Sequence, residues 1–206
     1  MINYYPALEQ DAVYHIYNRG NNRENIFYSP QNRNYFLEKY ARYMSGVLDT
    51  YAYNLLPNHF HLLVKVKRKE DFVIDLPGFE NLEGLDAGDI VSELFRRFFM
   101  SYAKAINKQE GRVGSLFQKN FKRRLVQSDP HFIHLIYYIH ANAQLHDLCM
   151  DFRDWPYSSY PSMLSSSPTR LIRQYVLDKF ESRQAFERYH QAYINLKNIE
   201  DLIIED

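Results

Sequence analysis

The order of hydrophobic periodicities between residues 13 and 127 restricts the possible folds more than any other feature of this chain. Alternating apolar and polar residues predict strands, whereas apolar residues three or four positions apart predict helices. Six elements follow one another: a strand at 13–18, a helix at 30–44, strands at 49–56 and 59–66, a helix at about 90–108 and a strand at about 116–127. This is the element order of the ferredoxin-like unit. We therefore expect an α+β, ferredoxin-like fold, in which an antiparallel sheet carries helices packed on one face.

Beyond this unit the chain is predicted to be mostly helical. Ser128, Asp129 and Pro130 form a typical helix start, with a capping oxygen and a proline in the first turn. After Asp151, prolines and serines interrupt the periodicity, and a helical tail is expected from about 171 to 204. The 206 residues are therefore divided into a domain over 1–150, with an acidic loop at about 70–92, and a mostly helical C-terminal extension over 151–206.

Features that indicate a cellular compartment agree with one another. No stretch approaches the roughly 18 consecutive apolar residues of a transmembrane helix. Residues 1–20 lack the apolar centre of a signal peptide. Because Cys149 is the only cysteine, no disulfide can form within the chain, as expected in a reducing compartment. We expect a cytoplasmic protein with no membrane partner.

Charge is balanced over the whole chain but unevenly distributed along it, with 25 basic and 25 acidic residues. Residues 70–93 include eight acidic residues and no basic one, which predicts an exposed loop. Residues 94–124 include nine basic residues against the single acid Glu110. From Phe117 to Val126, cations alternate with aromatic rings. This pattern suits a nucleic-acid strand, because cations neutralise phosphates and rings stack on unpaired bases. A solvated strand face is the alternative explanation.

Two groups of polar residues have the spacing of a reactive site. His59 and His61 are separated by one residue in a predicted strand, so both imidazoles project from one face of the sheet. They are either two metal ligands or a pair of surface histidines. On the helix after residue 130, polar residues spaced four apart share one face. They are His134, Tyr138, Asn142 and His146. A tyrosine hydroxyl one turn from an amide oxygen is either a nucleophile beside a metal ligand or an ordinary half-exposed pair.

Three segments of the chain resemble the single-tyrosine HUH transposases, and are most similar to the REP-associated tyrosine transposases. They are Tyr14-His-Ile-Tyr-Asn-Arg-Gly-Asn-Asn-Arg-Glu-Asn-Ile-Phe27, Leu56-Pro-Asn-His-Phe-His-Leu-Leu-Val64 and Tyr138-Ile-His-Ala-Asn142. The combination of Pro-Asn-His-Phe-His with Tyr-Ile-His-x-Asn is the specific part of the match. Phe121-Lys-Arg-Arg and Trp155-Pro-Tyr-Ser-Ser-Tyr also fit, and the resemblance runs from about residue 10 to 160.

The resemblance implies a metal-dependent DNA nicking and strand-transfer enzyme that acts on single-stranded or hairpin DNA. Tyr138 would be the nucleophile and would form a 5′-phosphotyrosine, while His59, His61 and Asn142 would hold one divalent ion. Such nitrogen and amide-oxygen ligands suit Mg²⁺ or Mn²⁺, and a single cysteine excludes a closed thiolate-rich zinc site. No nucleotide cofactor is expected, because a covalent intermediate retains the energy of the phosphodiester and the sequence has no P-loop.

Other interpretations keep some or all of these motifs. One is a domesticated, non-cleaving module of the same fold that binds structured single-stranded DNA or RNA. A metal-dependent hydrolase of small phosphoesters is disfavoured, because no carboxylate-rich two-metal site is apparent. Relatives include monomers and dimers, so a homodimer is a further expected partner state, and a DNA-bound form would be associated with the nucleoid.

Residues outside the predicted metal site are assigned mainly to DNA. The predicted contacts are Asn18, Arg19 and Asn22 in a turn-rich loop, and the cations Arg96, Arg97, Lys119, Lys122, Arg123 and Arg124. His134 shares the face of Tyr138 and either assists it or is structural. Tyr137 points about 100° away and has Ala141 one turn on, so Tyr138 is favoured as the nucleophile. Because the net charge is zero, either the acidic segment 70–93 shields the basic face until DNA arrives, or DNA binding is weak. Deletion of the segment should raise DNA affinity only in the first case.

Overall fold

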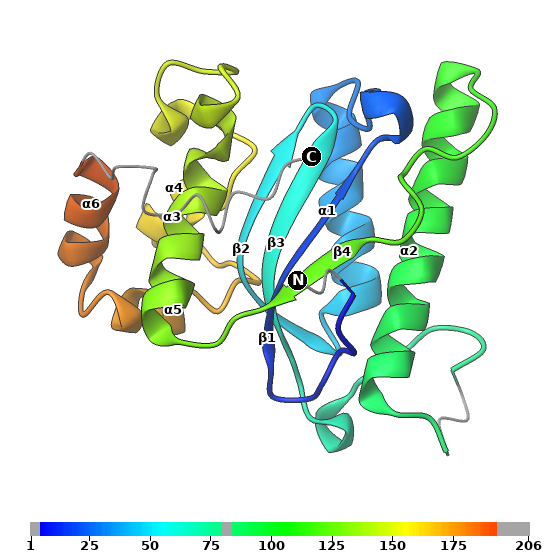
Figure 1. The fold of residues 1–206 in the computed structure, drawn as a ribbon, viewed down its shortest axis with the longest axis horizontal. Helices are drawn as coiled ribbons and strands as arrows, with labels where there is room; N and C mark the ends of the chain where they lie inside the picture. The colour runs from blue at the N-terminus through cyan, green and yellow to red at the C-terminus, as the bar shows by residue number, and fades with distance from the viewer. Residues whose placement is uncertain (1–4, 80–83, 193–206) are drawn as a thin grey trace.

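A single four-stranded sheet forms the centre of the structure, a computed structural model that describes residues 5–79 and 84–192 (Figure 1). The strands are β1 (Val13–Arg19), β2 (Leu48–Leu56), β3 (His59–Val66) and β4 (Lys122–Leu125). They pair in the order β2-β3-β1-β4, and every pair is antiparallel. One helix connects β1 to β2 and another connects β3 to β4. The predicted α+β, ferredoxin-like fold is therefore confirmed.

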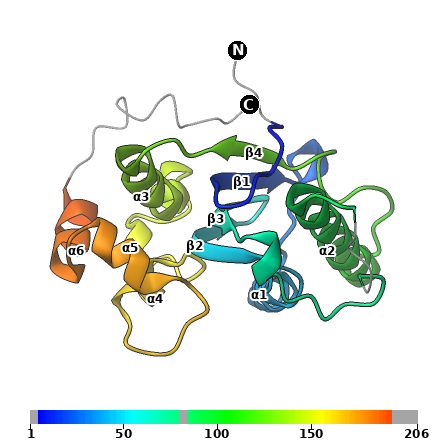
Figure 2. The same cartoon turned by 90° about the horizontal axis from the view of Figure 1, so that it is seen from below.

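The sequence predicted helices on one face of this sheet, but they cover both faces, because the chain continues from the edge strand β4 into the next helix on the opposite side (Figures 1 and 2). One face carries α1 (Pro30–Met44) and α2 (Ala87–Glu110), the two helices of the ferredoxin-like unit. The other face carries α3 (Asp129–Leu145), followed by the shorter helices α4 (Tyr160–Leu164), α5 (Arg173–Lys179) and α6 (Arg183–Gln191). In the part of the chain that the structure describes, no helix combines the length and apolar character needed to cross a membrane.

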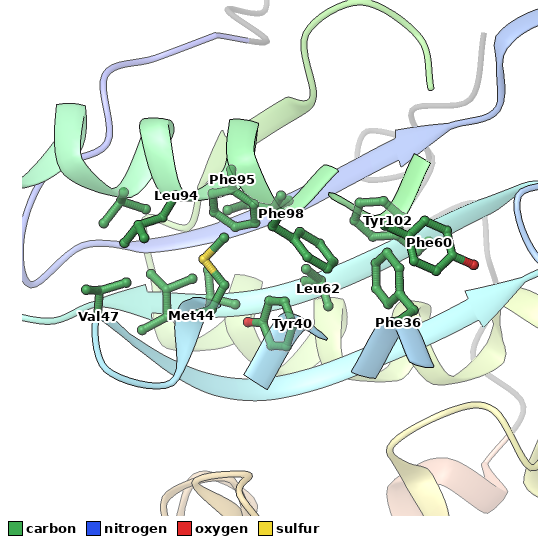
Figure 3. Close-up of a cluster of buried hydrophobic side chains, with 14 of the residues drawn as sticks. Phe36, Tyr40, Met44, Val47, Phe60, Leu62, Leu94, Phe95, Phe98 and Tyr102 are labelled. Atoms are coloured by element: carbon green, nitrogen blue, oxygen red, sulfur yellow. The ribbon is translucent and has the colours of Figure 1, made fainter. Parts of the chain in front are cut away.

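Residue alternation in β3 separates two hydrophobic cores. Phe60 and Leu62 face α1 and α2, whereas Leu63 faces α3. Figure 3 shows the first core, where the ring of Phe36 lies 5.1 Å from that of Phe60 and 4.9 Å from that of Phe98. Truncation of a buried phenylalanine costs about 3–5 kcal/mol, so this core gives the sheet a rigid support.

The helix ends follow local signals in the sequence. At the start of α1, the Ser29 hydroxyl accepts a hydrogen bond from the Asn32 backbone N–H at 3.2 Å. Ser128 caps α3 in the same way, accepting from the His131 N–H at 3.3 Å. Helix α2 ends at Gly111, whose φ of 62° lies in the left-handed region that glycine adopts without strain. The predicted start at Ser128 is therefore confirmed.

Two expected elements are shorter than predicted. The strand expected over about 116–127 extends only from Lys122 to Leu125, because Asn120 has a left-handed φ of 63° that interrupts the extended chain. The helical tail expected over about 171–204 is not continuous: α5 and α6 are separated at Glu181, with a φ of 69°, and the Ser182 hydroxyl caps α6. Residues 193–206 lie outside the described residues.

The region after residue 150 shares a hydrophobic core with α3. Phe152, Tyr160, Val176 and Phe186 are all buried in this second core, together with residues of α3, β2 and β3. The described part of the C-terminal extension therefore fixes α3 on the sheet. The domain boundary at residue 150 stays a prediction.

Candidate active site

The candidate site lies on the face of the sheet that α3 covers. In the antiparallel register, His61 lies opposite Tyr17 and His59 lies opposite Arg19. Because alternate residues of a strand point to the same face, His59 and His61 both project toward α3 while Phe60 enters the first core. The two imidazole centroids are 5.2 Å apart and their planes are nearly perpendicular.

Helix α3 brings Tyr138 and Asn142 to these histidines. The ring of Tyr138 lies 5.6 Å from the ring of His61, edge to face. The Oδ1 atom of Asn142 lies 3.1 Å from Nε2 of His59. All four side chains are at least 95% buried, so they interact in a medium of low polarity. The structure therefore brings together within one chain the four residues that the sequence had separated by about 80 positions.

Each ring nitrogen of His59 faces an amide oxygen. Nδ1 lies 2.6 Å from Asn58 Oδ1, and Nε2 lies 3.1 Å from Asn142 Oδ1. A neutral imidazole carries only one N–H, and the shorter contact places it on Nδ1, which donates to Asn58. The Nε2 lone pair then faces a second electron-rich atom, the Asn142 oxygen. Both atoms are then available as ligands for one cation.

His15 on β1 orients His61. Nε2 of His15 lies 2.8 Å from Nδ1 of His61, and the two rings are stacked with centroids 5.0 Å apart. Burial, reinforced by the nearby charges of His131 and Arg124, lowers the pKa of His15 to about 3, so this imidazole is neutral. It can therefore accept a hydrogen bond from His61 Nδ1. His61 then has its lone pair on Nε2, as in metal-binding histidines whose other nitrogen donates to a neighbour.

The resulting donor set fits a single divalent ion. Among the residues that the structure describes, no three or more His, Cys, Asp or Glu side chains are grouped to hold a metal, so the third protein ligand would be the Asn142 oxygen. Adjacent ligands on an octahedral ion with bonds of about 2.1 Å lie about 3 Å apart. The 3.1 Å separation of His59 Nε2 and Asn142 Oδ1 meets this requirement. Three ligands would leave open positions.

Tyr138 and its neighbour Tyr137 face different parts of the molecule. The ring of Tyr137 lies 5.8 Å from Phe152 and 5.6 Å from His190, in the second core. Tyr138 faces His61, and its ring lies 6.1 Å from that of His15. The geometry therefore agrees with the preference for Tyr138 over Tyr137 as the reactive tyrosine.

Buried polar contacts fix the position of α3. The Asn54 amide of β2 donates to the carbonyl of Ile139 at 2.7 Å. On another side of α3, His190 Nδ1 donates to the Phe186 carbonyl at 2.8 Å, and its Nε2 accepts from His140 Nδ1 at 3.0 Å. His140 Nε2 in turn accepts from the Ser159 hydroxyl at 2.8 Å. These bonds require neutral imidazoles, and burial lowers the pKa of His190 to about 4.

Comparison with known proteins finds similarity to transposases in sequence and in structure. No family model matches the chain. A protein of Haemophilus influenzae that is named as a REP-associated tyrosine transposase is 26% identical over 115 residues, which are 54% of this chain and 58% of that relative. The chain therefore matches less than two thirds of the relative's length. A solved structure, of a REP-associated tyrosine transposase bound to a REP hairpin, matches 82% of this chain and 89% of its own, with a TM-score of 0.59 and 16% identity.

The chain is similar to REP-associated tyrosine transposases in sequence and in fold. The resemblance found in the sequence is thereby confirmed. The likeness to the solved transposase concerns the fold, since the identity is low.

Three of the cations that were predicted to contact DNA lie on β4, and they divide between its two faces. Lys122 lies opposite Tyr17 and Arg124 lies opposite His15, so both are on the face of the candidate site. The Lys122 ammonium is 6.0 Å from the centre of the Tyr17 ring. Arg123 is on the other face, where its Nε donates to the Pro6 carbonyl at 2.5 Å.

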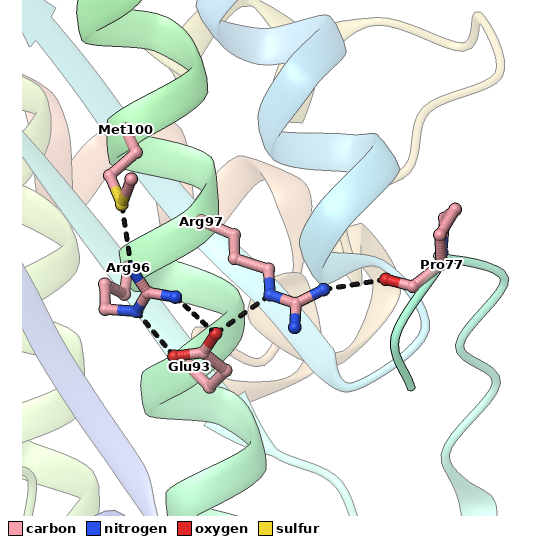
Figure 4. Close-up of polar contacts among 5 residues, drawn as sticks. All are labelled: Pro77, Glu93, Arg96, Arg97 and Met100. Atoms are coloured by element: carbon pink, nitrogen blue, oxygen red, sulfur yellow. Dashed lines mark hydrogen bonds and ion pairs between the residues drawn. The ribbon is translucent and has the colours of Figure 1, made fainter. Parts of the chain in front are cut away.

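The remaining predicted cations lie away from the candidate site. Arg96 and Arg97 are on α2, across the sheet from α3, and both bind the Glu93 carboxylate (Figure 4). Arg97 also donates to the Pro77 carbonyl at 2.7 Å. Lys119 is exposed in the segment before β4.

The predicted loop residues and His134 also differ in their surroundings. Asn18 accepts from the Arg19 backbone N–H at 2.8 Å, which holds the end of β1. Asn22 has a left-handed φ of 55° in a short 3₁₀ turn and is exposed. His134 faces α6, where its ring lies 6.4 Å from that of Tyr189. His146, at the end of α3, reaches the site instead, with its ring 4.9 Å from that of His59.

Sequence reasoning did not assign His15 or Asn58 to the site. Asn58 directly precedes His59 in the Pro-Asn-His-Phe-His motif, but no local pattern gives its side chain a role. His15 alternates with Tyr17 on β1, and it meets His61 only through the antiparallel register of β1 with β3. The alternation of His15 and Tyr17, opposite a His-x-His strand, was the available signal.

Proposed function

We propose that this chain is a metal-dependent DNA nicking and strand-transfer enzyme that acts on single-stranded or hairpin DNA. The observation that supports this proposal is the close placement of Tyr138 beside His61, with Asn142 beside His59, in one chain. The similarity to REP-associated tyrosine transposases agrees with this chemistry. A homodimer stays a prediction, because the four residues meet without a second copy.

His59, His61 and Asn142 would hold one Mg²⁺ or Mn²⁺ ion. When bound, such an ion polarises the scissile phosphate and offsets negative charge that develops in the transition state. His15 and Asn58 contribute by accepting hydrogen bonds from the Nδ1 atoms of the two imidazoles, which keeps both Nε2 lone pairs available.

Tyr138 is the proposed nucleophile. Its oxygen attacks phosphorus, the bond from phosphorus to the 3′-oxygen breaks, and the leaving oxygen takes a proton to become a 3′-hydroxyl. The 5′-phosphotyrosine can later be attacked by a 3′-hydroxyl, which restores the phosphodiester and releases Tyr138, so no nucleotide cofactor is needed. A tyrosine has an ordinary pKa near 10, so Tyr138 needs the metal ion, a base or a nearby cation to activate it at neutral pH.

The proposed substrate is DNA with an unpaired or hairpin segment. The solved REP-associated tyrosine transposase, which has a similar fold, is bound to a REP hairpin in its structure. In this chain, Lys122 and Arg124 are on the face of β4 that carries the candidate site, where they can neutralise phosphates of the bound DNA.

Labelled hairpin oligonucleotides test the proposal. Hairpins from the DNA flanking the gene, carrying a 5′ or 3′ label, are incubated with the protein and Mn²⁺ or Mg²⁺ and separated on denaturing gels. We expect a covalent adduct with the wild type and with Tyr137→Phe, and none with Tyr138→Phe or with His59→Ala/His61→Ala. Cleavage by Tyr138→Phe would overturn the assignment of the nucleophile. Binding without an adduct on every hairpin would favour the non-cleaving module.

A further inference from the structure

A second feature that suits nucleic acid lies on the opposite side of the sheet from the candidate active site. A groove of about 960 Å³ runs between α2 and the segment 114–123. This volume is near the upper end of the roughly 300–1,000 Å³ typical of ligand pockets. The groove is open, and it adjoins the edge strand β4.

Positive charge lines this groove. Its charged residues are Arg96, Lys104, Lys119 and Arg123, and no aspartate or glutamate is among the described residues that line it. Lys104 and Lys119 are exposed. Four cations without an acid in the lining favour a polyanion such as a phosphodiester chain.

Aromatic rings lie between these cations. Tyr5, Phe99 and Phe121 line the groove, and Tyr5 is 49% exposed. The Arg123 guanidinium lies 5.1 Å from the centre of the Phe121 ring. Phe121 is itself supported by Phe95, with centroids 4.7 Å apart. Rings held next to cations form the kind of surface on which unpaired bases stack while their phosphates are neutralised.

The edge strand β4 lies between the groove and the candidate active site. Successive residues of β4 alternate between the two faces, so that Lys122 and Arg124 face the site whereas Arg123 lines the groove. On the neighbouring strand, Tyr17 is near Lys122 and Asn18 lines the groove. A strand that crosses β4 would therefore contact cations on both faces.

We propose that this groove binds unpaired nucleotides of the DNA strand that continues from the cleaved phosphate. This inference rests on the proposed function and assigns Tyr5, Phe99, Lys104 and Phe121 to substrate binding. It differs from the hydrolase interpretation, because a small phosphoester would not reach from the active site to the groove.

Glu93 competes with DNA for one cation of the groove. Its carboxylate accepts from Arg96 at 2.6 and 2.7 Å and from Arg97 at 2.8 Å (Figure 4). The hydrogen bonds from Arg96, which have the largest effect, and from Arg97 lower the pKa of Glu93 to about 2. The carboxylate is therefore ionised at neutral pH. A DNA phosphate that binds Arg96 has to replace Glu93.

Binding of fluorescein-labelled dT15, measured by fluorescence polarisation in the Tyr138→Phe protein, tests the groove without covalent reaction. We expect Lys104→Ala/Lys119→Ala to weaken binding about tenfold and to reduce the salt-dependence slope by about 1.4, since each phosphate contact to a single strand contributes about 0.7. Tyr5→Ala should weaken binding about fivefold or more with no change in slope. Glu93→Gln should strengthen it two- to fivefold.

A matched control removes the same charge elsewhere. Arg183→Ala/Arg188→Ala removes two exposed cations on α6, which lies across the molecule from α2 in Figures 1 and 2. This control should change the affinity less than twofold. Equal weakening by both double variants would overturn the groove proposal and indicate a general charge effect. The groove proposal would also be overturned if the Lys104→Ala/Lys119→Ala protein bound dT15 with wild-type affinity, or if the protein did not bind dT15 at all.

Nicking of hairpins separates this inference from the proposed function. In the otherwise wild-type protein, Lys104→Ala/Lys119→Ala should raise the hairpin concentration needed for half-maximal adduct formation, and saturating hairpin should restore the rate. If hairpins are nicked through Tyr138 but the groove variants match the wild type, only the groove proposal fails. If Tyr138→Phe still nicks while the groove variants bind weakly, only the proposed nucleophile fails.

Discussion

At the scale of single residues, the site depends on which nitrogen of each histidine carries the hydrogen. His59 and His61 could be recognised in the sequence because strand alternation places them on one face. Their partners could not be assigned from local pattern. Asn58 contacts His59 because of the orientation of its side chain, and His15 contacts His61 because of the register of β1 with β3. A sequence motif specifies neither the orientation nor the register. Asn142 was expected from resemblance, and its contact with His59 depends on how α3 lies on the sheet.

Removing the acceptor beside His61 should weaken metal binding. We expect His15→Ala to lower the affinity for Mn²⁺ by about 10- to 100-fold, because His61 then loses the hydrogen bond that keeps its lone pair on Nε2. His15→Gln, whose amide oxygen can also accept from Nδ1, should recover part of the loss. Electron paramagnetic resonance of free Mn²⁺ measures both affinities. Wild-type affinity in His15→Ala would show that the hydrogen bond does not set the tautomer.

At the scale of elements, predictions succeeded where a signal lies within one segment. The helix expected over 30–44 has those bounds, because Ser29 and Pro30 mark its start and its aromatic residues recur at helical spacing. The tail was predicted as one helix because its periodicity does not reveal that Glu181 adopts a left-handed conformation. The attachment of α6 to α3 was not foreseen, since it depends on His190 meeting His140 across 50 residues.

The buried contact between α6 and α3 should make stability depend on pH. A histidine in the unfolded chain has a pKa near 6.5, whereas burial lowers that of His190 to about 4. Below pH 6.5 the unfolded state binds more protons at His190 than the folded state does. The contribution of neutral His190 to the free energy of unfolding is therefore complete above pH 6.5 and is lost as the pH falls toward 4. The difference corresponds to about 3 kcal/mol at most.

Urea unfolding between pH 7.5 and 4.5 measures this dependence. The wild type should lose stability over the interval more steeply than His190→Leu, even though the variant is less stable at pH 7.5. His140 also remains neutral through burial and titrates in the same direction in both proteins, so the difference in slope reports His190. Parallel slopes would contradict the role given to His190.

At the scale of the whole molecule, a net charge of zero conceals two surfaces of opposite sign. The cationic groove beside α2 adjoins a second hollow, whose charged lining residues are the acids Glu9, Asp86 and Asp89 and the cations Lys69 and Arg123. Arg97 holds the preceding acidic loop against α2 through the Pro77 carbonyl and the Phe79 ring, 4.3 Å away. Sequence alone identified the separation of charge along the chain, but it could not place the acidic segment beside the basic one.

Neutralising the acids next to the groove should strengthen DNA binding. Asp86→Asn/Asp89→Asn removes two negative charges, and the Asp86 side chain makes no capping hydrogen bond to α2 that the change would break. We expect affinity for dT15 to increase a few-fold at 50 mM salt. The gain should disappear at 500 mM salt, where charges are screened over a few ångströms. An increase that persists at 500 mM would instead indicate a direct contact.

The identity of the residue that becomes attached to DNA tests the central claim most directly. The adduct formed with a hairpin and Mn²⁺ is digested with nuclease and protease, and the modified peptide is sequenced by tandem mass spectrometry. We expect a nucleotide 5′-phosphate on Tyr138, in the peptide that also contains Tyr137 and Asn142. Attachment to Tyr137, or to a residue outside α3, would contradict the account.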